Sequence, residues 1–311
     1  MLAPLQRRVV NHLLTNFSFW QRRGVHIVPN HFYQPIPDTR TLKDELWDER
    51  SALAGLRMNL GRQLELLAHF AAEFKGEYEA LPRERTAVAH QYFVNNKAFE
   101  SVDAEILYCM IRHFKPRRIF EIGSGNTTYL SAQAVLKNEA ESGKACDLVA
   151  FEPYPNEVLR AGFPGLSRLV ETRAQDIPLE KFAELDEGDI LFIDSSHVLK
   201  IGSDVQRLYL EILPRLNKGV LVHVHDIFLP AEYPREWVVG EHYFWNEQYL
   251  LQAFLAFNYT FKIRWAASYM HLSHPDQLAA AFNSYDRSTT WPGSFWMSTG
   301  GADGRAAPND L

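Results

Sequence analysis

Several features that define other classes of protein are scarce in this sequence. Only two of its 311 residues are cysteines, Cys109 and Cys146, too few for a disulfide framework and at a spacing that suits no zinc motif. No apolar run approaches the length of about 18 residues that a membrane span requires. Lysine and arginine form no dense run, and the formal charge is -6. We therefore expect no membrane contact and no nucleic-acid partner. The N-terminal residues lack an uninterrupted signal-peptide core, so we expect a reduced, cytoplasmic location.

What the sequence does contain is a strand, a glycine turn and a helix start within residues 118–130, RIFEIGSGNTTYL. Gly123 and Gly125 follow the strand directly. Glycine takes positive φ and, without a Cβ, lets a ligand approach the backbone closely. Thr127 and Thr128 stand where a helix begins, and a helix N-terminus offers N–H groups to an anion. The pattern predicts a nucleotide-binding turn, with an ordinary tight turn as the alternative.

Two residues narrow the class of ligand. A dinucleotide fingerprint needs a third glycine three positions after the second, and Thr128 stands there instead. Glu121 lies inside the apolar strand, where an unpaired carboxylate is costly. An acid followed by Gly-x-Gly resembles the first motif of class I S-adenosylmethionine-dependent methyltransferases, in which the acid helps to hold the methionine end of the cofactor. By this resemblance, the residues expected to bind S-adenosyl-L-methionine here are Glu121, Gly123, Ser124, Gly125, Thr127 and Thr128.

Beyond this motif, strand-like and helical segments alternate along the chain. Such alternation predicts an α/β fold, a doubly wound, mostly parallel sheet with helices on both faces. The resemblance implies seven strands ending in an antiparallel hairpin, the Rossmann-like methyltransferase fold. We expect strands at 148–151, 168–172, 190–193, 220–224, 260–269 and 294–297, and helices at 128–136, 157–161, 179–185 and 204–216.

Polar residues follow the expected strands at the edge where ligands bind in such sheets. Glu152, 27 positions after Gly125, stands where a carboxylate accepts hydrogen bonds from ribose hydroxyls, with a solvated loop residue as the alternative. Gln175 and Asp176 resemble the adenine-contact position of the family. By the same resemblance, Tyr92 and Asn95 in the segment before the first strand are candidate cofactor contacts, although capping and turns explain an asparagine nearly as well.

The ends of the fourth and fifth strands carry two acids and two histidines, Asp194, His197, His225 and Asp226. Neighbouring strands bring these side chains together, and such a group is common at functional sites. Asp194, His197 and His225 are the candidate catalytic residues, with a histidine as general base and Asp194 also near the cofactor. Alternatively, Asp194, His225 and Asp226 bind a divalent metal, which is magnesium or, because a histidine is not an oxygen ligand, a softer ion.

Three segments are expected. Residues 1–89 form an N-terminal extension, an irregular aromatic arm followed by a helical cap, and the arm either packs on the main domain or closes over the substrate. Residues 90–298 form the methyltransferase domain. Residues 299–311, rich in small residues, form a disordered tail.

The resemblance is strongest to the small-molecule, methyltransferase-24-like branch. It implies methyl transfer from S-adenosyl-L-methionine to a small-molecule acceptor, expected to be a hydroxyl oxygen, with help from a general base or a divalent metal. Two alternatives remain: a metal-dependent, hydroxylase-like redox enzyme on the same fold, and a non-catalytic cofactor-binding module. The oligomeric state is open, and a homo-oligomer is compatible with the sequence.

Overall fold

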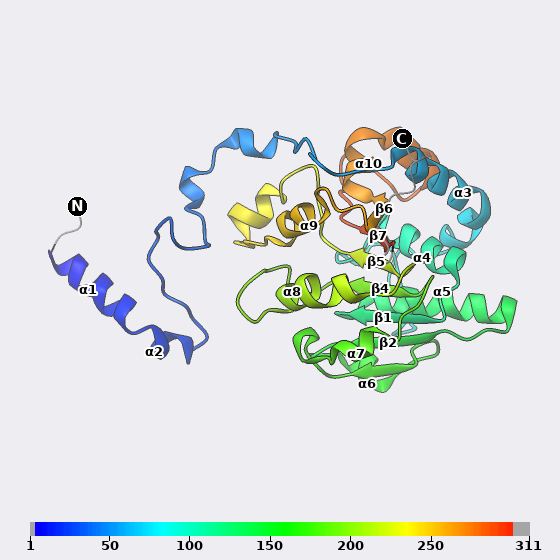
Figure 1. Ribbon diagram of the computed structural model, residues 1–311, viewed down its shortest axis with the longest axis horizontal. Helices are drawn as coiled ribbons and strands as arrows, with labels where there is room; N and C mark the ends of the chain where they lie inside the picture. Colours follow the sequence, from blue (N-terminus) through cyan, green and yellow to red (C-terminus); the bar gives the residue numbers. More distant parts are fainter. Residues whose placement is uncertain (1–3, 301–311) are drawn as a thin grey trace. The chain divides into compact units, whose positions relative to one another are not determined.

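The computed structural model describes residues 4–300, which divide into two compact units (Figure 1). The first contains the residues up to Glu49 together with Pro234–Phe244. The second contains Arg50–Tyr233 and the residues from Trp245 onward. The domain boundary expected at residue 89 falls inside the second unit, and residues 301–311 of the expected tail lie outside the described part.

The first unit is more helical than expected, because the arm predicted as irregular begins with two helices. Val9, Val10, Leu13 and Leu14 recur at helical spacing, a pattern that the reading of the arm as irregular overlooked. Asp38 is held within the unit by Arg40, at 2.6 Å, and by Asn30, at 2.8 Å. The elements are α1 (Pro4–Thr15), α2 (Phe17–Gln21), the 3₁₀ turns η1 (Thr39–Thr41) and η2 (Asp44–Trp47), and the π-helical turn η6 (Glu236–Gly240).

The second unit is built on a seven-stranded sheet of order β3-β2-β1-β4-β5-β7-β6. The first five strands are parallel, and β7 runs antiparallel to both β5 and β6. The predicted α/β, doubly wound sheet with a final antiparallel hairpin is therefore confirmed. The strands are β1 (Arg118–Ile122), β2 (Asp147–Phe151), β3 (Arg168–Val170), β4 (Ile190–Ile193), β5 (Leu221–Val224), β6 (Phe261–Ala266) and β7 (Phe295–Thr299).

Helices and short helical turns connect the strands. The helix expected over 204–216 changes type along its length, from α through π to 3₁₀. None of the described helices has both the length and the apolar character needed to cross a membrane. The elements are α3 (Leu60–Tyr78), α4 (Asp103–Phe114), α5 (Asn126–Ser142), α6 (Glu157–Ala161), η3 (Ala174–Asp176), α7 (Leu179–Phe182), α8 (Asp204–Arg207), η4 (Leu208–Ile212), η5 (Leu213–Arg215), α9 (Glu247–Leu255), α10 (Ala267–Ser273) and α11 (Pro275–Ala281).

The sheet separates two apolar layers because successive strand residues point to opposite faces. Ile119 packs in the layer that contains α3, α4, α5, α10 and α11, whereas Phe120 packs in the layer of α7, α8 and α9. Figure 1 shows α4 and α5 on one side of the strands and α8 and α9 on the other. Both faces are covered, which explains why β1, β4 and β5 are almost continuously apolar.

The sixth strand is shorter than expected. It was predicted to continue to residue 269 but ends at Ala266, because α10 begins at Ala267. The N–H of Ala267 donates to the carbonyl of Ser294, at 2.9 Å, and Ser268 Oγ donates to the carbonyl of Phe228, at 2.8 Å. These contacts join residues that are far apart in the sequence, so no local pattern predicts the change from strand to helix.

Arg112 ties three helices together. Its side chain is only 3% exposed, and Nε lies 2.7 Å from Glu77 of α3 while Nη2 lies 2.8 Å from Glu141 of α5. Nη1 also donates to Asn138. A guanidinium removed from water in this way is tolerated because its N–H groups are paired.

We expect Arg112→Met to lower the free energy of unfolding by about 2–3 kcal/mol, since Glu77 and Asn138 lose their charged partner. Urea unfolding followed by circular dichroism measures this change. The matched control is Arg117→Met, because Arg117 is 66% exposed and pairs with Asp186 at the surface, and its loss should cost less than about 1 kcal/mol. Equal effects of the two substitutions would contradict the assignment of Arg112 as a structural tie.

Candidate active site

The turn after β1 is fixed by its contact with the end of β4. Gly123 has a φ of +80°, and a Cβ on it would lie 1.8 Å from the carbonyl oxygen of Asp194. Only glycine fits this position. The N–H of Asp194 in turn donates to the carbonyl of Ile122, at 2.9 Å. A Cβ on Gly125 would meet no described atom within 4 Å, so the turn is open on that side.

Glu121 lies just before this turn and is buried. Thr127 Oγ1 donates to its Oε1, whereas Oε2 has no hydrogen-bond partner among the described residues. Burial raises the pKa of Glu121 to about 8, partly offset by hydrogen bonds from Thr127 and Thr128 and reinforced by the nearby acids. The strand therefore holds one half-satisfied carboxyl group below the open side of the turn.

The two threonine hydroxyls of α5 are engaged within the protein. Thr127 contacts Glu121, as described, and Thr128 Oγ1 accepts from the N–H of Gly125, at 3.0 Å. Ser124 differs, because its buried Oγ has no partner in the described part of the chain. Both threonines thus shape the turn, and Ser124 is the hydroxyl left for a ligand.

Glu152 follows β2 and borders the same turn. Its Oε2 accepts from the N–H of Ser124, at 3.2 Å, and its Oε1 accepts from the N–H of Tyr154, at 2.8 Å. These backbone donors fix the carboxylate at the carboxyl end of β2, the position expected from the sequence.

The two residues proposed for adenine contact have different surroundings. Asp176 pairs with Arg173 at 2.7 Å, in an ion pair that is about half exposed. Gln175 is half-buried and lines a pocket of about 230 Å³ with Ser203 and Gln206. The surroundings of Gln175 fit a ligand contact better than those of Asp176.

The ends of β4 and β5 meet around His197. Its Nε2 lies 3.3 Å from Asp194 Oδ1 and 3.4 Å from Asp226 Oδ2, and its Nδ1 lies 3.0 Å from Glu247 Oε2. The backbone of His197 has a φ of 56°, in the left-handed region that few residues other than glycine adopt. Trp245 packs against the imidazole with ring centroids 4.3 Å apart. One histidine is thus surrounded by three acids.

The acids and the histidine stabilise one another's charges. Burial alone would lower the pKa of His197, but hydrogen bonds to Asp194 and Glu247 and the charge of Asp226 raise it well above its usual value. Burial would raise the pKa of Asp194, yet His225 and His197 lower it to about 2. These interactions favour the ionised form of Asp194 and the protonated form of His197.

His225 stands beside this group and does not lie at its centre. Its Nε2 is 3.6 Å from Asp226 Oδ1, and its ring packs on Phe99, at 4.9 Å between centroids. Although burial lowers the pKa of His225, the charges of Asp226, Asp194 and Asp103 raise it overall. Its Nδ1 has no hydrogen-bond partner among the described residues.

Two buried acids near the site were not expected. Glu247, the first residue of α9, holds His197, and its only sequence signal is its place at a helix start, where acids are common anyway. Asp103 accepts from the N–H groups of Gly293, at 2.8 Å, and Ser294, at 2.9 Å. Gly293 in turn packs closely on Asp226, because a Cβ on Gly293 would lie only 3.1 Å from the Cα of Asp226. Nothing in the local sequence links residues so far apart.

One group of side chains in the described part of the chain is placed to share a metal ion. Asp194, His197 and Asp226 each offer one ligand atom, and these atoms lie within 4.8 Å of one another. The sequence prediction placed His225 in this group, but the structure has His197 between the two aspartates. Two carboxylates and one imidazole form a donor set that suits several divalent ions.

The two candidates before β1 are engaged within the protein. Tyr92 is fully buried, and its hydroxyl donates to the carbonyl of Phe99, at 2.6 Å. Asn95 is exposed and donates to Glu84, at 2.6 Å. Asn96 lies nearer the turn, since its Oδ1 accepts from Asn126, at 3.2 Å. These side chains shape the entry segment, and the structure does not bring Tyr92 or Asn95 to the turn.

Comparisons with known proteins agree with this geometry. Residues 120–227 match the model of a family described as a methyltransferase domain. This span covers the glycine turn, Glu152 and the acids and histidines at the ends of β4 and β5. The chain is also 30% identical to an uncharacterized protein of Archaeoglobus fulgidus over 172 residues, which cover 52% of this chain and 75% of that protein.

The raised pKa of Glu121 makes stability depend on pH. Its pKa rises from 4.5 in the unfolded chain to about 8 on folding, so the folded chain binds the extra proton and its stability falls as pH rises through this interval. Glu121→Gln removes this pH-dependent loss of stability. We expect the free energy of unfolding of the variant, relative to that of the wild type, to increase by a few kcal/mol between about pH 5 and pH 9.

Urea unfolding across this pH range checks the expectation. The matched control is Glu139→Gln, since Glu139 is exposed on α5 and its replacement should leave the pH dependence unchanged. A constant difference between Glu121→Gln and wild type at all pH values would mean that Glu121 is ionised in the folded chain.

Proposed function

The chain belongs to the class I S-adenosylmethionine-dependent methyltransferases, and from this premise we propose that it methylates a hydroxyl group of a small-molecule acceptor. The carboxylate of Asp194 holds this hydroxyl group in place. The observation that carries the proposal is the place of Asp194. It borders the glycine turn through the backbone of Gly123 and is the most exposed acid around His197, with 33% of its side chain accessible.

The residues around the turn fit the cofactor. Glu121 Oε2 and Ser124 Oγ are buried polar atoms without partners in the described part of the chain, and a Cβ on Gly125 would meet no described atom within 4 Å. Glu121 suits the cationic ammonium of a methionine group, and Glu152 suits ribose hydroxyls. When bound, S-adenosylmethionine supplies a methyl group made electrophilic by its sulfonium centre.

Asp194 suits a substrate hydroxyl for electrostatic reasons. With its pKa lowered to about 2, it is ionised throughout the physiological range and accepts a hydrogen bond from the hydroxyl. This bond orients the oxygen, and the carboxylate takes up the proton as the oxygen is alkylated. His197, fixed on its far side by Glu247, keeps Asp194 in place and is a positioning residue in this scheme.

Aromatic side chains near His197 support a partly apolar acceptor. The half-buried ring of Trp245 packs on His197, and the buried ring of Tyr233 packs on Trp245 at 6.1 Å between centroids. An indole ring beside the acids favours a flat or apolar acceptor.

A divalent metal is a second candidate for assistance, because Asp194, His197 and Asp226 lie close enough together to share one ion. An ion held there would act as a Lewis acid on the acceptor oxygen. Activation by Asp194 alone and activation by a metal ion differ in a measurable way, since only the mechanism with the ion requires metal for turnover.

The cofactor half is tested by titration of the purified protein with S-adenosylhomocysteine in a calorimeter. We expect saturable one-to-one binding, and we expect Glu152→Ala to weaken it by about tenfold or more through loss of charge-assisted hydrogen bonds. The control is Glu171→Ala, an exposed acid after β3 that pairs with Arg160. Absence of binding by the wild type would remove the proposed function.

The catalytic half is tested with Asp194→Asn, which keeps the shape of the side chain and removes its charge. We expect the affinity for S-adenosylhomocysteine to stay within about threefold of wild type. Turnover should fall about 100-fold or more, as for loss of a general base. The assay follows S-adenosylhomocysteine release with a panel of hydroxylated aromatic acceptors.

Asp276→Asn serves as the control, because Asp276 is exposed on α11. Normal turnover by Asp194→Asn would exclude this carboxylate from the reaction. Chelator treatment followed by addition of Mg²⁺ or Mn²⁺ separates the two versions: activity that survives the chelator supports the metal-free one, and activity restored only by metal supports the other.

A further inference from the structure

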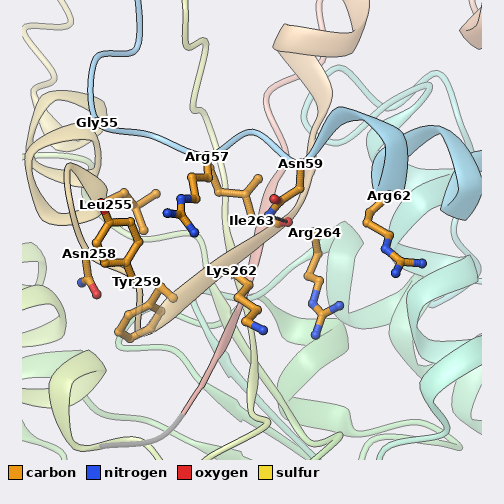
Figure 2. A pocket seen from close by; sticks show the side chains of 11 residues that line it. Gly55, Arg57, Asn59, Arg62, Leu255, Asn258, Tyr259, Lys262, Ile263 and Arg264 are labelled. Carbon is orange, nitrogen blue, oxygen red and sulfur yellow. Dashed lines mark hydrogen bonds between the residues drawn. The ribbon is translucent and has the colours of Figure 1, made fainter. Parts of the chain in front are cut away.

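A second pocket of about 770 Å³ lies at the edge of the sheet, beside β6. Its wall consists of β6, the loop that leads into it, and the chain segment that ends in the first turn of α3. Asn59 Nδ2 donates to the carbonyl of Ile263, at 3.3 Å, which joins the segment to the strand. The lining residues are Gly55, Arg57, Asn59, Arg62, Leu255, Asn258, Tyr259, Phe261, Lys262, Ile263 and Arg264 (Figure 2).

The pocket gathers four cationic side chains, Arg57, Arg62, Lys262 and Arg264, and its lining contains no acid. Within the described residues, Arg62 is the member with an acidic partner, Glu65, and that pair is exposed on α3. Arg57, Lys262 and Arg264 form no ion pair there. Like charges at one place repel each other, so this arrangement costs free energy that a bound anion would offset.

The cationic groups are held in position by other contacts. Arg264 Nε donates to Ser298 Oγ, at 2.8 Å, which leaves its terminal nitrogens for a ligand. The guanidinium of Arg57 lies over the ring of Tyr259, 4.3 Å from the centroid. Figure 2 shows Lys262 and Arg264 extending from the same side of β6. Partial burial lowers the pKa of Arg264, and the positive charge of Arg62 adds to this effect.

We propose that this pocket binds an oligophosphate group, the diphosphate or triphosphate of a soluble ligand. Arginine forks bind phosphate oxygens in pairs, and several cations around one cavity match an anion with several charges. The volume suits a ligand of nucleotide size. Tyr259, 52% exposed, adds a flat surface for an attached ring.

This pocket is distinct from the methyl-transfer site. The pairing of the strands places it near the start of β5, whereas the methyl-transfer site lies beyond the end of β5. Lys262 pairs with Ser298, which pairs with Leu221 at the start of β5. Asp226 instead follows the end of β5, which is Val224. The inference therefore does not depend on the proposed methyl transfer.

The charge distribution favours a small ligand over a nucleic acid or a membrane surface. The whole chain has a formal charge of -6, which disfavours the approach of an extended polyanion. The cationic side chains line a concave pocket, whereas lipid or nucleic-acid binding uses a broad basic face.

The test is calorimetric titration of the full chain with inorganic pyrophosphate and inorganic triphosphate at low salt. We expect one-to-one binding that is at least about tenfold weaker for orthophosphate and weakens with added salt. The double variant Lys262→Gln/Arg264→Gln should lose about tenfold or more in affinity, and Lys144→Gln, an exposed lysine in the loop before β2, should lose none.

Arg57→Gln, from a different segment, provides a second measure if the double variant unfolds, with an expected loss of about threefold or more. Saturating S-adenosylhomocysteine should leave triphosphate binding unchanged. The proposal is overturned by absence of binding, by equal affinity in the variants, by displacement with S-adenosylhomocysteine, or by binding to phosphatidylglycerol vesicles without binding to triphosphate.

Discussion

The close contact between Gly123 and the carbonyl of Asp194 is the constraint on which the candidate active site depends. It occurs where β1 and β4 end side by side, and it permits no side chain at residue 123. Because the contact is between backbone atoms, it holds the turn that carries the candidate cofactor residues directly against the strand end that carries the acids. Any residue with a Cβ would push these two halves apart, and a misplacement of about 1 Å is enough to impair an alignment-dependent reaction.

The second half of the site depends on compensation of charge. Asp194, Asp226 and Glu247 approach one imidazole, that of His197. Three acids removed from water would be costly, and a protonated histidine between them offsets part of that cost. The arrangement needs α9, because Glu247 approaches the ring from the side opposite the two aspartates. Such a fixed group stabilises the ionised form of Asp194.

The sheet could be predicted well from the sequence because the pattern that specifies each strand is local. Apolar runs indicate strands, and Glu121 inside one of them indicated a special turn. The acids and histidines at the strand ends were also found, since parallel strands bring their carboxyl ends to one edge. Which of these residues lies at the centre of the group was not predicted. His197 takes the central place through its backbone turn and Glu247, 50 positions away. The burial of Tyr92 was not predicted either, because a tyrosine buried by tertiary packing has no local signature.

The basic pocket beside β6 is a second feature that could not be predicted from the sequence. Arg57 and Arg62 are separated by about 200 positions from Lys262 and Arg264, so no charge run announces it. Lys262 and Arg264 alternate with buried residues on an edge strand, a pattern that by itself indicates only a solvated face. The chain segment before α3 turns that face into a pocket by binding the edge of β6 through Asn59. A net negative charge for the whole chain therefore does not exclude a local positive potential, because the fold decides which charges meet.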